Sequence, residues 1–131
     1  MRSKTLNKCA LIGNLVRKPD LNQTRTGVSV CNFHLITDRE WKDKEGNLKS
    51  ESERHNCLAW NRLAEICHEL LEKGSLVFVE GRLSNRKFTG REGQELSETV
   101  VVVGDMIILD QKRRPQDEGN HELRDIDSKY K

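Results

Sequence analysis

The chain has 131 residues, with 23 basic and 21 acidic side chains and a formal net charge of +2. This length allows one ordinary domain and a short tail. Because the basic and acidic residues are nearly equal in number, the net charge neither favours nor excludes a nucleic-acid partner. No apolar run approaches the ~20 residues that a membrane span needs, and the first residues lead into no apolar signal-peptide core. We therefore expect an intracellular, cytoplasmic protein with no membrane partner.

Motifs for metal or catalytic chemistry are absent from the sequence. There is no Cys-x-x-Cys pair, no P-loop, no nucleophile elbow and no His-Glu-x-x-His. We expect no cofactor, no metal and no enzymatic activity. The cysteines are interpreted as small buried apolar residues, because disulfides are rare in a reducing compartment. They are Cys9, Cys31, Cys57 and Cys67.

The first half of the chain predicts three strands. The strand over 6–16 contains Gly13, which indicates a bulge or a close approach of two backbones. The strand over 28–37 alternates apolar and polar residues, and the strand over 54–60 follows a charged stretch with a hairpin tip near Gly46. The link between the first two strands is predicted to be irregular.

The second half predicts one helix and two further strands. The helix over 62–73 starts after Asn61 as N-cap and ends before Gly74. Strands are expected over 76–83 and 96–109, joined by a second long hairpin. One side of the helix is expected to carry an apolar stripe, formed by Leu63, Ile66, Leu70 and Leu71. The last strand is expected to be interrupted at Gly104.

The order β-β-β-α-β-β is that of an OB-fold, so the predicted class is all-β with one helix. This is a five-stranded, partly open barrel, here with long hairpins, and its second and third strands form the ligand face. The expected domain covers residues 1–110. Residues 111–131 are rich in charge and are predicted to be a flexible tail.

Three aromatic residues lie among charged residues in loops and at strand ends. They are Trp41, Trp60 and Phe88. Rings beside Arg and Lys are typical of grooves in which unpaired bases stack and cations hold the phosphates. Each also has a structural interpretation: Trp41 could pack on its own strand, Trp60 could fill a corner of the core, and Phe88 could lie in an oligomer interface.

Several segments in order carry a family resemblance over about residues 5–110. They are Leu6-Asn7-Lys8, Leu11-Ile12-Gly13-Asn14-Leu15, Trp41-Lys42-Asp43-Lys44, Glu53-Arg54-His55-Asn56, Val79-Glu80-Gly81-Arg82-Leu83 and Arg86-Lys87-Phe88-Thr89. Together they resemble bacterial single-stranded DNA-binding proteins. The resemblance implies a homotetramer, with a dimer as the alternative. It also implies binding of single-stranded DNA without strong sequence preference, in replication, recombination and repair.

The resemblance also implies a set of nucleic-acid-binding residues. The stacking positions of the family fall on Trp41, Arg54, Trp60 and Phe88, and Arg54 stands where the family usually has tryptophan. A guanidinium can stack on a base, so binding is expected to persist there. The basic positions fall on Lys8, Arg86 and Lys87, while Asn56 and Ser84 stand where the family often has arginine.

Other functions stay open at this point. A primosomal-type OB-fold adaptor with weak DNA binding is the main alternative, and an oligomeric module that has lost DNA binding is another. Stacking grooves accept RNA as well as DNA. The resemblance also implies replication and repair proteins as partners, which the family recruits through an acidic tip. The tail here ends in Tyr130-Lys131, so either the tip is missing from this sequence or the protein does not recruit partners in that way.

Overall fold

The computed structural model describes residues 4–110, and the predicted tail over 111–131 lies outside them. Six strands and one helix are found within the described range. They are β1 (Cys9–Leu15), β2 (Asp20–Gln23), β3 (Ser29–Lys42), β4 (Leu48–Trp60), α1 (Asn61–Leu70), β5 (Leu76–Thr89) and β6 (Glu95–Asp110).

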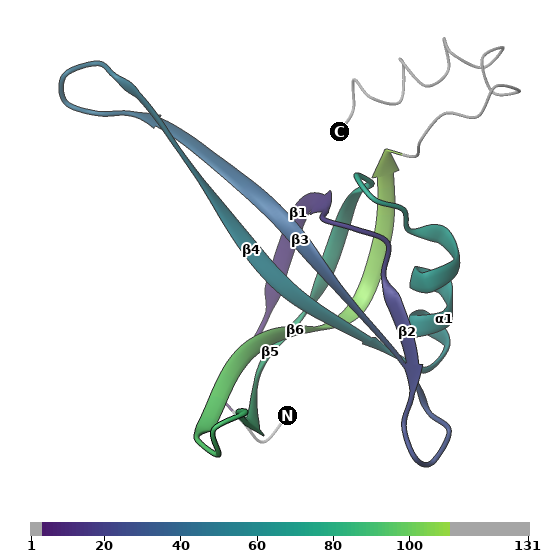
Figure 1. The fold of residues 1–131 in the computed structure, drawn as a ribbon. Coiled ribbons are helices and arrows are strands. Elements are labelled where there is room, and N and C mark those ends of the chain that lie inside the picture. The colour runs from purple at the N-terminus through teal and green to yellow at the C-terminus, as the bar shows by residue number, and fades with distance from the viewer. Residues whose placement is uncertain (1–3, 111–131) are drawn as a thin grey trace, which may run out of the picture.

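The strands form one sheet that closes on itself. Its order is β1-β5-β6-β4-β3-β2, and β1 also pairs with β3. The β4–β6 pair is parallel and the other pairs are antiparallel. The second pairing of β1 closes β1, β5, β6, β4 and β3 into a barrel, with α1 beside it (Figure 1). The predicted OB-fold barrel with one helix is confirmed.

One strand of the sheet was not predicted. The link expected to be irregular contains β2, which pairs with β3 from Asp20↔Asn32 to Gln23↔Ser29. The backbone N–H of Thr24 donates to the carbonyl of Val28 at 2.9 Å and closes the turn between them. With only four residues, β2 is too short for alternation to be read from sequence.

The two hairpins are longer than predicted, because their charged segments are strands rather than loops. The β3–β4 ladder continues to Lys42↔Leu48 and the β5–β6 ladder to Thr89↔Glu95. The predicted tip at Gly46 is confirmed, since this residue lies in the turn with a φ of +84°. Both hairpins extend from the barrel on the side away from α1 (Figure 1).

The barrel interior is filled by inward-facing residues of all five barrel strands and of α1, among them Phe33, Leu35 and Cys67, and by Leu71 just after α1. Three of the cysteines are fully buried in this core, as expected, while Cys9 is half-buried. Burial raises the pKa of the Cys31 thiol to about 11 and of the Cys57 and Cys67 thiols to about 12. These thiols are therefore protonated at neutral pH.

The helix, predicted over 62–73, begins one residue earlier and ends three residues earlier than expected. Asn61 is its first residue and has a φ of +58°, and Trp60 takes the N-cap position. Among the described residues, no side chain caps the helix. The buried side of α1 is formed by Ala64 and Cys67, followed by Leu71, whereas Leu70 of the predicted stripe is exposed. No helix within residues 4–110 is long and apolar enough to cross a membrane.

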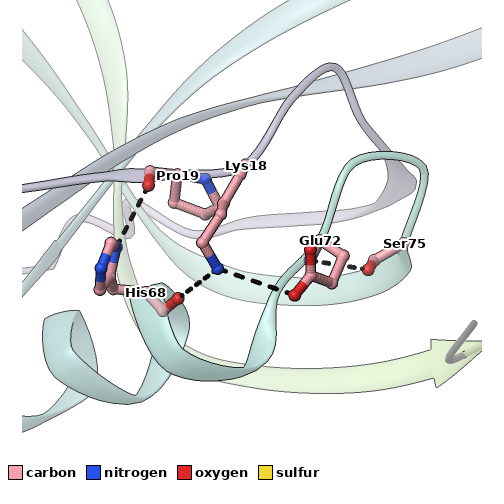
Figure 2. Close-up of polar contacts among 5 residues, drawn as sticks. All are labelled: Lys18, Pro19, His68, Glu72 and Ser75. Atoms are coloured by element: carbon pink, nitrogen blue, oxygen red, sulfur yellow. Dashed lines mark hydrogen bonds and ion pairs between the residues drawn. The ribbon is translucent and has the colours of Figure 1, made fainter.

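The C-terminal end of α1 is held to the β1–β2 connection by polar contacts (Figure 2). The ammonium of Lys18 donates to the carbonyl of His68 at 3.1 Å and lies 3.7 Å from the Glu72 carboxylate. His68 Nδ1 lies 3.2 Å from the carbonyl oxygen of Pro19 and must donate, because that oxygen can only accept. The half-buried His68 therefore fastens the helix to the barrel.

Closure of the barrel depends on a close backbone approach at Gly13, as its place in the sequence indicated. A Cβ atom on this residue would lie 2.5 Å from the carbonyl oxygen of Ile36. The next residue, Asn14, forms the first β1–β3 pair with Ile36. A side chain at Gly13 would therefore push β1 and β3 apart where they close the barrel.

The substitution Gly13→Ala is expected to lower the free energy of unfolding by about 1–3 kcal/mol, the usual cost of overpacking. Urea denaturation followed by circular dichroism measures this change. Gly104→Ala is the matched control, since a Cβ there meets only Glu80 O at 3.6 Å, an ordinary contact. Equal stability of the two variants would contradict the role given to Gly13.

Candidate nucleic-acid interface

One continuous surface of the barrel gathers many of the predicted binding residues. On β4, Cys57 and Ala59 point into the core, so Arg54, Asn56 and Trp60 point outward by the alternation of a strand. Strand β4 adjoins β6 through Cys57↔Val101 and Leu58↔Val102. We call this surface the outer sheet face; its side chains on β4, β5 and β6 are Arg54, Asn56, Leu58, Trp60, Arg82, Ser84, Arg86, Phe88, Leu96, Glu98, Val100 and Val102.

The β5–β6 hairpin brings Arg86 and Phe88 to this face. Arg86 lies opposite Glu98, and Phe88 lies opposite Leu96. Because Val101 and Val103 point into the core, the alternate residues of β6 face outward with their partners on β5. The outer sheet face thus unites residues from β4 and β5 that are far apart in sequence.

The aromatic rings on this face are open to solvent. Trp60 keeps 39% of its surface exposed and Phe88 keeps 46%. Between the two rings along the sheet, the outward-facing Leu58 and Val100 are almost fully buried. The face is therefore packed in its middle, and a large exposed ring lies toward each end of it. The interpretation of Trp60 as a core residue is wrong.

A polar cluster crosses the middle of the outer sheet face. The Glu98 carboxylate accepts from the Arg86 guanidinium at 2.5 Å through one oxygen and from Asn56 Nδ2 at 3.1 Å through the other. The hydrogen bond from Arg86 is the main cause that lowers the pKa of Glu98. Glu98 is therefore ionised at neutral pH and holds side chains from two other strands.

The histidine nearest this cluster is uncharged at neutral pH. His34 lies directly opposite Asn56 on β3. Burial lowers its pKa, and the positive charges of Arg54 and Arg17 lower it further. Arg54 itself has no carboxylate within 4.0 Å among residues 4–110, so its charge is available to an anion on this face.

Trp41 lies apart from the other predicted stacking residues. It is on the outer half of the β3–β4 hairpin, opposite Lys49, and by alternation on the other surface of that hairpin from Arg54. The Arg39 guanidinium covers its ring, with Cζ 4.4 Å from the ring centroid, and also lies 3.8 Å from the Glu51 carboxylate. Trp41 packs on its own hairpin and still keeps 37% of its surface exposed.

The predicted lysines are not among the side chains that define the outer sheet face. Lys87 is opposite Ser97, on the other surface of the β5–β6 hairpin from Arg86, with its ammonium 4.0 Å from the Glu95 carboxylate. Lys8 precedes β1, and its ammonium lies 3.5 Å from the Glu80 carboxylate. A binding path that used every predicted residue would have to leave the barrel surface and pass around both hairpins.

Sequence reasoning missed some residues of this site. Arg82 shares the outer sheet face, opposite Val102, and its place on the polar side of β5 was the available signal. The Arg39-x-Trp41 spacing was the signal for a stacked guanidinium, since alternate residues of a strand share a face. Glu98 gave no signal, because its partners come from other strands.

The chain is similar in sequence to proteins of a known family. A model of the single-strand binding protein family covers residues 6–109. The single-stranded DNA-binding proteins of Neisseria meningitidis serogroups A and B are 39% identical over 105 residues, or 80% of this chain. The chain spans only 60% of the length of these relatives. Single-stranded DNA-binding protein 1 of Chlorobaculum tepidum is 40% identical over 111 residues, which cover 84% of this chain and 68% of that protein.

Solved structures with the same fold are also found. A Plasmodium falciparum SSB in complex with single-stranded DNA has a TM-score of 0.76 and 31% identity, covering 84% of this chain and all of that one. A deletion mutant of the single-stranded DNA-binding protein from Thermus aquaticus has a TM-score of 0.71 and 32% identity, covering 80% of this chain and 51% of that one. With an OB-fold barrel and a family match over nearly all the described residues, the chain belongs to the single-strand binding protein family.

Proposed function

We propose that this protein binds single-stranded DNA without strong sequence preference and protects it during replication, recombination and repair. Bases stack on exposed rings while arginine side chains hold the phosphates. The domain responsible is residues 1–110, which bind and assemble without catalysing a reaction. The observation that carries the proposal is the pair of exposed rings, Trp60 and Phe88, on one sheet face with Arg54 and Arg86.

The chemistry of that face favours single strands over duplexes. A ring can stack only on a base whose face is free, and in a duplex the bases are stacked on one another. The SSB that shares this fold is described in complex with single-stranded DNA.

Arg54 fits the same mechanism, with a charged guanidinium in place of an aromatic ring. Its planar guanidinium can lie on a base and reach a phosphate at the same time. Trp41, Lys87 and Lys8 are proposed to contact DNA that continues beyond the outer sheet face, around the hairpins. Because the outer sheet face carries only part of the predicted cationic charge, we expect the affinity for DNA to depend strongly on these additional contacts.

We further propose that the chain assembles with copies of itself into a homotetramer. Strands β1, β5 and β6 carry outward apolar residues in one row, Ile12↔Phe78↔Ile107. Ile12 keeps 56% and Ile107 keeps 50% of its surface exposed. A row of exposed apolar side chains across a sheet is typical of a protein–protein contact. The row contains no residue of β4, so Trp60 lies outside it.

Replacing both outer-face rings, Trp60→Ala and Phe88→Ala, is expected to weaken binding of an oligo-dT strand severely. Each stacked base contributes roughly 1–3 kcal/mol, so each single variant should lose about 5- to 150-fold in affinity. Fluorescence anisotropy of a labelled oligonucleotide measures this without using the tryptophan signal. A duplex of the same length should bind weakly to all variants.

Leu70→Ala is the matched control for this experiment, since it truncates an exposed apolar residue on α1, away from the outer sheet face. Its affinity should equal that of the unaltered protein. Normal binding by the ring variants would refute the stacking site. A folded, unaltered protein that does not bind single strands would refute the function and favour the primosomal-type adaptor.

The substitution Ile107→Glu is expected to break the tetramer, because it places a charge in the apolar row. Sedimentation equilibrium should show tetramer mass for the unaltered protein and a smaller mass for the variant. Leu70→Glu adds the same charge to another exposed apolar site and should leave the mass unchanged. A monomeric unaltered protein would rule out self-assembly.

A further inference from the structure

The outer sheet face contains a carboxylate that already occupies its own cationic site. Glu98 comes from β6 and lies between Asn56 of β4 and Arg86 of β5. One of its oxygens accepts from the guanidinium and the other from the amide. The side chains of Arg86 and Glu98 keep 46% and 34% of their surface exposed, so the pair is within reach of a ligand.

The contact with Asn56 shows that Glu98 fixes more than one partner. The amide of Asn56 donates to Glu98, while its Oδ1 is buried and has no donor among residues 4–110. A buried acceptor without a donor is costly. The carboxylate therefore fixes Asn56 in an orientation that leaves its other end unsatisfied, which is expected of a strong charge-assisted contact.

We propose that Glu98 is an internal competitor for the phosphate that Arg86 would bind, and so sets the affinity of this face for single-stranded nucleic acid. This inference rests on the proposed function and concerns its regulation. The carboxylate and a phosphate oxygen are both anionic acceptors that seek the same guanidinium donors. DNA must displace Glu98 from Arg86, or else bind beside a negative charge that repels it.

The net charge of the pair also indicates that Glu98 reduces the contribution of Arg86 to DNA binding. An Arg–Glu pair has no net charge, so it releases no condensed cations from the DNA when the strand binds. The lowered pKa of Glu98 keeps the carboxylate charged throughout the neutral range. Arg54 has no such carboxylate partner within residues 4–110 and keeps its positive charge on the same face. Arg86 contributes fully only once Glu98 is neutral or displaced.

The test is a double-mutant cycle with Glu98→Gln and Arg86→Ala. Glutamine keeps the shape and the acceptor oxygen but removes the charge. We expect Glu98→Gln to tighten oligo-dT binding by about 2- to 5-fold at moderate salt, as estimated from the strength of exposed ion pairs. The plot of log affinity against log salt should steepen by about 0.7, the value for one added phosphate contact on a single strand.

The cycle separates competition from a general loss of negative charge. Glu92→Gln removes the same charge at the tip of the same hairpin and should have a smaller effect. In the Arg86→Ala background, Glu98→Gln should give no more gain than Glu92→Gln gives in the unaltered protein. Thermal unfolding should show little change for either glutamine variant, because exposed ion pairs add little stability.

Each remaining outcome would overturn the proposal. Weaker binding by Glu98→Gln would mean that the carboxylate positions Arg86 for DNA. A gain that persists without Arg86, or that equals that of Glu92→Gln, would mean a general charge effect. If the unaltered protein binds single strands and Glu98→Gln does not tighten the complex, only this inference fails. If no variant binds, the proposed function fails with it.

Discussion

Strand β1 must approach β3 more closely than a side chain at Gly13 would permit, and the rest of the structure depends on this contact. A Cβ atom at that position would lie 2.5 Å from Ile36 O. Without closure, the sheet would have β1 at one edge and no fixed interior. Closure divides each strand into inward and outward residues. The core on one side and the candidate interface on the other are two consequences of the same geometry.

Alternation then determines which residues meet on the surface. The inward positions Cys57 and Ala59 force Asn56 and Trp60 outward, and the register of β5 against β6 brings Arg86 beside Glu98. The site is therefore held by the packed core beneath it and by the sheet ladder, rather than by loops. Rigid placement of this kind favours a stacking surface, because a ring that is already oriented loses little entropy when a base arrives.

Much of this arrangement could be predicted from sequence, since it depends on a period of two. The shared face of Arg54, Asn56 and Trp60 followed from alternation alone. The positions of Trp41 and Lys87 could not be predicted in this way, because beyond the barrel the two surfaces of a hairpin are no longer inside and outside. The Arg86–Glu98 pair depends on a register that shifts at the bulge opposite Glu80 and Gly81. Sequence marked the interruption at Gly104, where the shift lies, but local patterns encode neither the resulting register of Arg86 against Glu98 nor the contact of His68 with the β1–β2 connection.

The length of the β3–β4 hairpin has a consequence for local stability. From Thr37↔Glu53 outward, its strands pair with each other and with no other described strand, since the contacts of β1 with β3 and of β6 with β4 lie nearer the barrel. A ribbon of two strands is marginal by itself, and cross-strand pairs such as Arg39 with Glu51 hold this one. Its amide protons should exchange with solvent at a lower opening free energy than those of the barrel. The segment that carries Trp41 can thus open and close again while Phe33 and Leu35 stay packed.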